Sequence, residues 1–300
     1  MERLGHHLLH FDDHYLREES SKNYGMALRA FYEICPYGRF AHLATNFAIL
    51  ESLPCDVQVI HIIDFDVGEG EQWPALLAVL NHRISVKLSV IHCKEVKKTR
   101  NNLCSFACSI GLSLQVEEIE MEELLLMFDR TVNENEWFVF NCMVGLPHMG
   151  EPKRRRQVLE FTRVAEKVVT SYKGIGMISY GEGFGSRLKP FSDDHLVSSH
   201  ALFESLEWHF PSHLSLARTT MECLFVGPCV SLIDFVEDFE PFCGHGLREC
   251  RVSKERLMEV KEMVMKGRDE PYEIKVNGYC ENEMVLEWRG TPMVRLYTWR

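Results

Sequence analysis

Residues 57–80 read VQVIHIIDFDVGEGEQWPALLAVL, and this stretch decides the fold. It opens on alternating and adjacent valines and isoleucines, which favour a strand buried on both faces of a parallel sheet. Two acids follow, Asp64 and Asp66, and then a turn that contains Gly68 and Gly70. Pro74 then stands where a first helical turn tolerates proline, before an apolar helical pattern. Strand, glycine turn and helix form the first unit of a doubly wound α/β domain.

The crevice above such a turn is where folds of this kind bind small molecules, so the acids around it are candidate ligand contacts. Asp64, Asp66, Gly68 and Gly70 border the crevice, and Glu95 follows the next strand, where an acid would hold ribose hydroxyls. Two other interpretations stay open. The two aspartates would equally cap backbone amides of the turn, and Glu95 would cap the helix that follows it.

The rest of the chain alternates between helical and extended patterns. Two helices over 26–53, broken at Pro36, precede the first strand. The later expected strands are 86–92, 113–116, 137–143 and 177–180, and the expected helices are 96–110, 117–129, 153–168, 193–210, 219–239 and 254–266. Three extended runs, 272–276, 284–288 and 293–297, are joined by turn sequences and predict an antiparallel hairpin pattern. The fold class is therefore α/β, a mostly parallel doubly wound sheet of the S-adenosylmethionine-methyltransferase type, with a helical cap and an antiparallel C-terminal edge.

Composition and charge exclude several classes of protein. The formal net charge of -11 should repel nucleic acid, so DNA contact would need a local basic patch. We find no uncharged apolar stretch of about 18 residues, which argues against a membrane span. His6, His10 and His14 are spaced for one helix face, but nothing completes a metal site around them, so we predict none. The cysteines are scattered without paired spacing, as is typical of reduced thiols inside a cell.

One dense basic run stands out. It is KRRR at the start of an expected helix, formed by Lys153, Arg154, Arg155 and Arg156. The simplest interpretation is a solvated helix face. A nuclear-import signal or a phosphate contact is the alternative, because positive charge at a helix start opposes the helix dipole.

Several of these segments resemble one family. IHIIDFDVGEGEQWPALL resembles the VHIID motif of the plant GRAS-domain transcription regulators, with Ile60 in place of the first valine. FYEICPYGRFAHLATNFAILES (31–52) resembles the segment before that motif, and FVFNCMVGLPHM (138–149) resembles the opening of the second leucine-rich region. HALFESLE (200–207) is similar to the PFYRE region, and the ending with Trp288-Arg289-Gly290 and Trp299 is similar to the SAW region. Within the family, the chain resembles the nodulation-signalling type.

The resemblance implies one GRAS-like domain over residues 1–300. Residues 1–53 would form a helical cap that is short for the family, as in a shortened member or a fragment, and residues 54–300 the α/β core with inserted cap helices. It also implies a nuclear regulator of transcription that pairs with itself or another family member and docks onto DNA-binding partners such as zinc-finger proteins. Some members contact DNA themselves, but the net acidity here favours the co-regulator role. Candidate partner contacts lie on two amphipathic helices: Leu43, Phe47, Leu202 and Phe203.

Two alternatives use the same sheet differently. A class I methyltransferase would place S-adenosylmethionine over Gly68 and Gly70, its ribose on Glu95 and the methyl acceptor near Asn141. A small-molecule-binding regulator would keep the crevice without the chemistry. No general base with a defined partner is evident in the sequence, so we predict no catalytic residue, no required cofactor and no enzyme.

Overall fold

The structure is a computed structural model, and it describes residues 23–80, 83–92, 96–128, 136–144, 155–171, 175–183, 193–231, 246–248, 250–265, 271–277 and 282–300. Within these residues an eight-stranded sheet has the order β3-β2-β1-β4-β5-β8-β7-β6. Its strands are β1 (Val59–Asp66), β2 (Ser85–His92), β3 (Leu114–Glu118), β4 (Glu136–Val144), β5 (Gly176–Glu182), β6 (Tyr272–Asn277), β7 (Glu283–Trp288) and β8 (Thr291–Trp299). Every expected strand is present.

The sheet has a parallel part and an antiparallel part. Strands β1 to β5 pair in parallel, with β1 at the centre between β2 and β4. Strand β8 pairs antiparallel with β5 on one side and with β7 on the other, and β6 pairs antiparallel with β7. The last strand in sequence therefore lies inside the sheet. The predicted fold class, a mostly parallel sheet with an antiparallel C-terminal edge, is confirmed.

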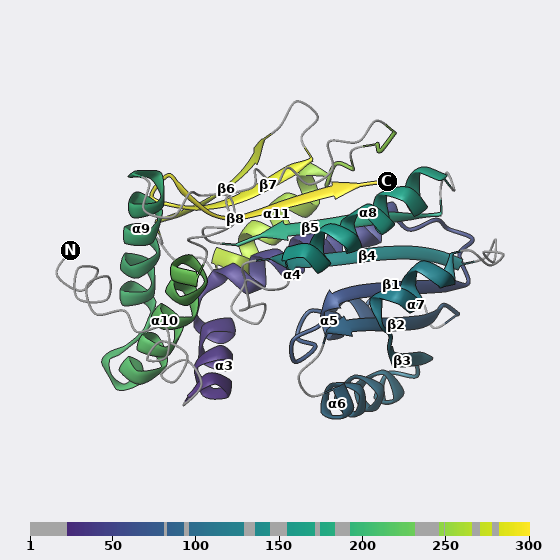
Figure 1. The fold of residues 1–300 in the computed structure, drawn as a ribbon, viewed down its shortest axis with the longest axis horizontal. Helices are drawn as coiled ribbons and strands as arrows, with labels where there is room; N and C mark the ends of the chain where they lie inside the picture. Colours follow the sequence, from purple (N-terminus) through teal and green to yellow (C-terminus); the bar gives the residue numbers. More distant parts are fainter. Residues whose placement is uncertain are drawn as a thin grey trace.

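Helices cover both faces of the sheet (Figure 1). Short α7 (Met121–Met127) and long α8 (Arg155–Ser171) pack on one face, against a core that contains Phe65, Phe140 and Phe161. On the other face α4 (Pro36–Ser52), α5 (Trp73–Leu77) and α6 (Val96–Ser109) cover the parallel strands. Helix α4 also contacts β8 and α11 (Lys254–Met265), so it spans the parallel and antiparallel parts.

A second group of helices stands at one end of the sheet (Figure 1). It consists of α3 (Tyr24–Ile34), α9 (Asp193–His209) and α10 (Ser215–Ser231). Together with α4 and α11 these helices enclose a core that includes Phe31, Phe40 and Trp288. The predicted break between the first two helices at Pro36 is confirmed, because Pro36 begins α4 directly after Cys35.

Three predicted boundaries were wrong. Glu117 and Glu118 belong to β3, and α7 begins after Glu120, whose side chain forms a capping box with Glu123. Helix α5 ends at Leu77 and does not continue to Leu80. Helix α10 begins at Ser215, four residues before the expected start; the expected end at 239 lies outside the described residues.

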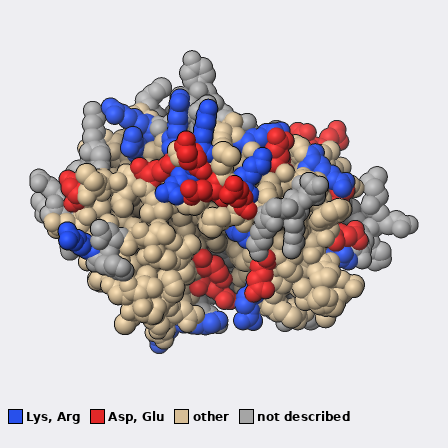
Figure 2. Space-filling view, turned by 180° about the vertical axis from the view of Figure 1, so that it is seen from behind, with Lys and Arg blue, Asp and Glu red and all other residues tan. Residues whose placement is uncertain are grey.

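The surface is charged and mixed on the side shown from behind (Figure 2). Acidic and basic side chains alternate across its upper half, and acidic side chains flank a hollow lower down. On helix α11, Arg256 donates to Glu259 at 2.6 Å. Among the described helices, none combines the length and apolar character that crossing a membrane requires.

Candidate functional site

The glycine turn after β1 has the backbone geometry that glycine permits. Gly68 and Gly70 have positive φ angles of 58° and 88°. A Cβ atom added to Gly70 would lie 3.2 Å from side-chain atoms of both Thr99 and Leu103 on α6. Gly70 is therefore needed for the turn and for the close approach of α6.

The two aspartates at the end of β1 bind the turn itself. The Asp66 amide donates to Asp64 Oδ1 at 3.2 Å, and the Gly68 amide donates to Asp66 Oδ1 at 3.2 Å. The Trp73 indole Nε1 donates to Asp64 Oδ2 at 2.9 Å. The interpretation in which these carboxylates cap turn amides is thus confirmed, and Asp64 also fixes the first residue of α5.

Side chains of the protein itself fill the space beside Asp64. Asn46 Nδ2 of α4 donates to the Gln72 carbonyl at 2.9 Å, and Asn141 Nδ2 of β4 donates to Gln72 Oε1 at 3.2 Å. Gln72, Asn46 and Asn141 are all buried. This polar group joins α4, the glycine turn and β4 at the carboxyl ends of the strands, where a ligand of this fold class would lie.

The described polar side chains of this crevice leave little exposed surface for a nucleoside cofactor. Asp64 and Asn141 are each only 2% exposed; Asp64 Oδ2 and Asn141 Nδ2 bond to neighbouring side chains, whereas Asn141 Oδ1 is buried without a hydrogen-bond partner among the described residues. Gly70 is buried against α6, Asp66 is buried, and Gly68 is half-buried. Glu95, the predicted ribose contact, lies outside the described residues.

Burial gives Asp64 an unusual acidity. Desolvation, and after it the negative charge of Asp66, raises the pKa of Asp64 from 3.8 to about 7, although hydrogen bonds from Trp73, Asn141 and the Asp66 amide act in the opposite direction. The same burial, together with Asp64 and Asp66, raises the pKa of the nearby Cys142 thiol. Asp64 is therefore a carboxyl group that changes charge near neutral pH.

Gly70→Val should destabilise the protein by about 2–5 kcal/mol, because a β-branched side chain there meets both an unfavourable φ and the packed α6. Gly111→Val is the matched control: its φ is 72°, but nothing lies within 4 Å of the added Cβ. Urea unfolding of both variants separates the two effects. If both lose the same stability, close packing of α6 is not the reason for glycine at position 70.

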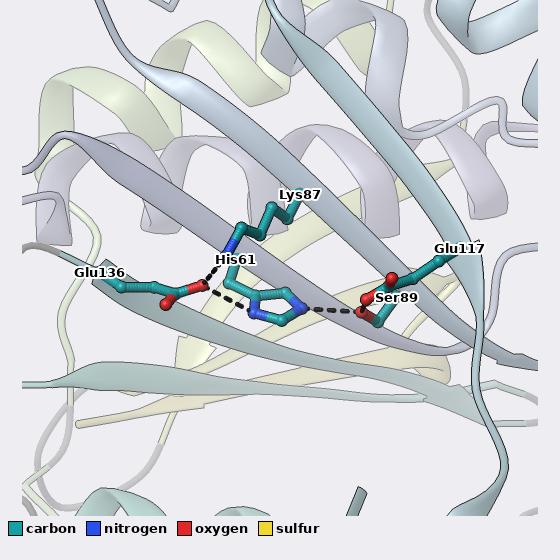
Figure 3. Close-up of polar contacts among 5 residues, drawn as sticks. All are labelled: His61, Lys87, Ser89, Glu117 and Glu136. Carbon is teal, nitrogen blue, oxygen red and sulfur yellow. Dashed lines mark hydrogen bonds and ion pairs between the residues drawn. The ribbon is translucent and has the colours of Figure 1, made fainter. Parts of the chain in front are cut away.

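A second polar cluster, which we call the His61 cluster, crosses four strands (Figure 3). His61 on β1 contacts Glu136 Oε1 of β4 through Nδ1 at 3.0 Å and Ser89 Oγ of β2 through Nε2 at 2.7 Å. Ser89 donates to Glu117 Oε1 of β3 at 2.9 Å, and Lys87 of β2 donates to Glu136 Oε1 at 3.0 Å. His61 and Ser89 are buried, whereas Lys87 reaches the surface.

The hydrogen bonds of this cluster form a chain across the strands. The Ser89 hydroxyl donates to Glu117, so its oxygen is left to accept from Nε2 of His61. Nδ1 of His61 lies against the Glu136 carboxylate. Hydrogen bonding from His61, and then from Lys87, lowers the pKa of Glu136 against the opposing effect of burial.

The order Ser89–His61–Glu136 has the geometry of a hydrolase triad, but not its accessibility. Ser89 is fully buried, and its proton is directed at Glu117. A nucleophile must reach a substrate carbonyl, so Ser89 is not placed for acyl transfer. The cluster links neighbouring strands, and sequence reasoning missed it because its members are separated by tens of residues.

The predicted partner contacts differ in their exposure. Leu43 and Phe47 on α4 are half-buried against the helical core, and the Arg256 guanidinium of α11 lies 5.0 Å from the Phe47 ring centre. Phe203 on α9 is also half-buried. Leu202 is fully buried inside the same core, so it stabilises the fold and is not available to a partner. Leu202 is therefore corrected from partner contact to core residue.

The basic run is only partly described. Lys153 and Arg154 lie outside the described residues, and α8 begins at Arg155. Arg156 is exposed on α8. The three histidines at positions 6, 10 and 14 also lie outside the described part of the chain.

Comparison with known proteins agrees with these observations. Protein NODULATION SIGNALING PATHWAY 2 of Medicago truncatula is 26% identical over 297 residues, which cover 91% of this chain and 58% of that protein. The protein of the same name from Lotus japonicus is 28% identical over 215 residues, 67% of this chain and 42% of that protein. The chain thus spans about half the length of these relatives.

A solved structure has the same fold, and a family model matches nearly the whole chain. The crystal structure of SCL7 from Oryza sativa superposes with a TM-score of 0.70 at 21% identity, and covers 95% of this chain and 88% of that one. It shares the fold described above. The model of the GRAS domain family matches residues 4–300. The chain therefore belongs to the GRAS domain family.

Proposed function

We propose that this protein regulates transcription in the nucleus by binding other proteins, among them DNA-binding factors, and that it is not an enzyme. The observation that carries the proposal is that buried polar side chains of the protein itself occupy the crevice at the carboxyl ends of the strands. Asp64, Gln72 and Asn141 bind one another and their neighbours there, which leaves the sheet as a scaffold for its helices. Membership of the GRAS domain family supports the regulatory role.

Charge supports docking onto a DNA-binding protein over direct DNA contact. The chain carries a formal charge of -11, and its rear face alternates acidic and basic side chains (Figure 2). DNA binding depends on Lys and Arg that neutralise several phosphates together. The run at 153–156 is the candidate for nuclear import, or for a phosphate contact, in this proposal.

Helix α4 is one candidate contact with a partner, either another GRAS-family chain or a zinc-finger protein. Its half-buried Leu43 and Phe47 lie at the boundary between the helical core and the surface. Apolar side chains at such a boundary are common in helix-mediated recognition. Phe203 on α9 occupies a comparable position.

A tethering experiment tests the proposal. Fusing residues 1–300 to an unrelated DNA-binding domain should change transcription of a reporter that carries the matching site, because recruitment then no longer depends on a natural partner. Phe47→Asp should reduce the effect several-fold if α4 holds a transcriptional partner. Far-UV circular dichroism and thermal unfolding of the purified variant must show an intact fold, since a loss of structure would assign Phe47 to the core alone. Unchanged transcription of the reporter in the presence of the wild-type fusion would contradict the proposal.

A further inference from the structure

Helix α9 carries a row of side chains on the side that faces away from the core. At about 100° per residue, seven positions fall within one third of the helix circumference. We call them the α9 stripe: Asp193, Leu196, Val197, His200, Glu204, Glu207 and Trp208. The exposed fractions of its apolar members are 39% for Leu196, 59% for Val197 and 57% for Trp208.

Trp208 is held in place although it is exposed. Its ring meets the buried Trp288 ring edge to face, with centroids 6.1 Å apart. Trp288 is fixed by its indole bond to Glu204 Oε2 at 3.0 Å, and the Arg289 guanidinium lies 5.5 Å over the same ring. Arg289 also donates to Glu204 Oε1 at 2.5 Å. An exposed aromatic ring on a rigid base loses little entropy on binding, as binding hot spots require.

The charge around the stripe is negative. Asp193 and Asp194 are exposed in the first turn of α9, and Glu207 is exposed beside Trp208. The nearby cation Arg289 is already paired with Glu204. Arg218 of α10 lies 3.6 Å from Glu207, but its side chain is largely buried and also pairs with Glu222. A partner would therefore meet apolar side chains framed by acids.

We propose that the α9 stripe docks a basic amphipathic helix of a partner protein. A straight helix of 17 residues offers a ridge roughly 25 Å long, which suits another helix. Leucine-like side chains of the partner would pack against Trp208, Leu196 and Val197, and its lysines or arginines would meet the flanking acids. The proposal rests on the proposed function, of which it names one surface and one class of partner.

A second copy of this chain is a poorer occupant. A two-fold interface places the same surface on both sides, so Asp193, Asp194 and Glu207 would face an identical acidic set. Like charges opposed in this way disfavour association. The basic helix α8 of a second copy is also no candidate, because Phe161 and Val168 on its apolar face are buried against the sheet.

Peptide binding tests the proposal directly. The probe is a fluorescein-labelled peptide of roughly 18 residues with leucines at helical spacing and lysines elsewhere, and binding is followed by anisotropy. The purified 300-residue chain should bind it, with affinity that falls as salt rises. Trp208→Ala and Val197→Glu should each weaken binding at least about tenfold. Val79→Ala is the matched control, because Val79 is equally exposed but follows α5, and it should leave binding unchanged.

Other results would overturn the proposal. A scrambled peptide of the same composition that binds equally would show general attraction to an acidic protein. Equal affinity in the Trp208→Ala and Val79→Ala variants would show that the peptide binds elsewhere. Light scattering that finds a wild-type dimer and a Trp208→Ala monomer would identify a second copy as the occupant. The reporter fusion separates the two proposals. If the fusion with Trp208→Ala regulates the reporter as well as the wild-type fusion does, the function is supported but this surface is not. If the peptide binds but the wild-type fusion does not change the reporter, the surface is supported but the function is not.

Discussion

His61→Ala should lower the free energy of unfolding by about 3–5 kcal/mol at neutral pH. The substitution removes one hydrogen-bond partner of Glu136 and one of Ser89, and leaves a cavity next to Phe138, whose ring centre lies 5.2 Å from the imidazole. Urea unfolding followed by circular dichroism measures the loss, and an unchanged m-value would show that the transition remains comparable.

Lys87→Met is the matched control for His61. Lys87 belongs to the same cluster, but its side chain is 40% exposed and binds Glu136 from outside. We expect a change within about 1 kcal/mol, as for other exposed ion pairs. His61→Gln should lie between the two, because an amide can replace one of the two hydrogen bonds but not both. If His61→Ala and Lys87→Met lose equal stability, the buried part of the cluster does not hold the strands together.

Asp64→Asn should change how stability depends on pH. In the wild type the folded-state pKa of Asp64 is raised from 3.8 to about 7, so the folded protein retains a proton that the unfolded chain has lost. Burial of Asp64 therefore lowers the free energy of unfolding progressively as the pH rises from about 4, and the full loss is present above about 7. The variant is neutral throughout. Between pH 4 and pH 8 its stability relative to wild type should rise on the order of 4 kcal/mol at most, from about 1.36 kcal/mol per pKa unit.

The absolute stability of the Asp64→Asn variant follows from its hydrogen bonds. Asn offers one acceptor oxygen, whereas Asp64 accepts from both Trp73 and the Asp66 amide. The variant should therefore be less stable than wild type near pH 4 and gain on it toward pH 8. Asp56→Asn, in the exposed turn before β1, controls for the loss of one surface carboxylate. If the difference in unfolding free energy between wild type and the Asp64→Asn variant were the same at every pH, a buried, titrating Asp64 would be contradicted.

The central unit could be predicted from sequence because its signals are local. The β-branched run, the two glycines and Pro74 each determine the conformation of a few neighbouring residues, and β1, the turn and α5 follow in that order. The turn sequences between the last three extended runs likewise predicted the antiparallel edge formed by β6, β7 and β8. The short length of α5 could not be read in this way, because the apolar residues beyond Leu77 continue the helical pattern.

The His61 cluster could not be predicted, since it depends on register between strands. His61 pairs with Lys87 and with Phe138, and Ser89 pairs with Glu117, which places polar side chains of four strands on one side of the sheet. A shift of one residue in any pair would turn those side chains to the other face. Spacing along the chain contains no information on that register.

The exposure of α9 also depends on its neighbours. The sequence predicts an amphipathic helix over 193–210, yet Leu196 is exposed while Leu202 and Leu206 are fully buried. Leu196 belongs to the outward-facing α9 stripe, whereas Leu202 and Leu206 lie on the side of the helix that packs into the core. Trp208 gave no sequence signal of its own beyond being an aromatic residue near a helix end.

The position of β8 has a consequence for synthesis on the ribosome. Strand β5 is complete at residue 182, but its neighbour in the sheet is not made until residues 291–299. During that interval the nascent chain presents the free edge of β5, and β6 and β7 have no attachment to the parallel strands. Unpaired edges of this kind promote aggregation. The nascent protein should therefore depend on chaperones until β8 emerges and closes the sheet.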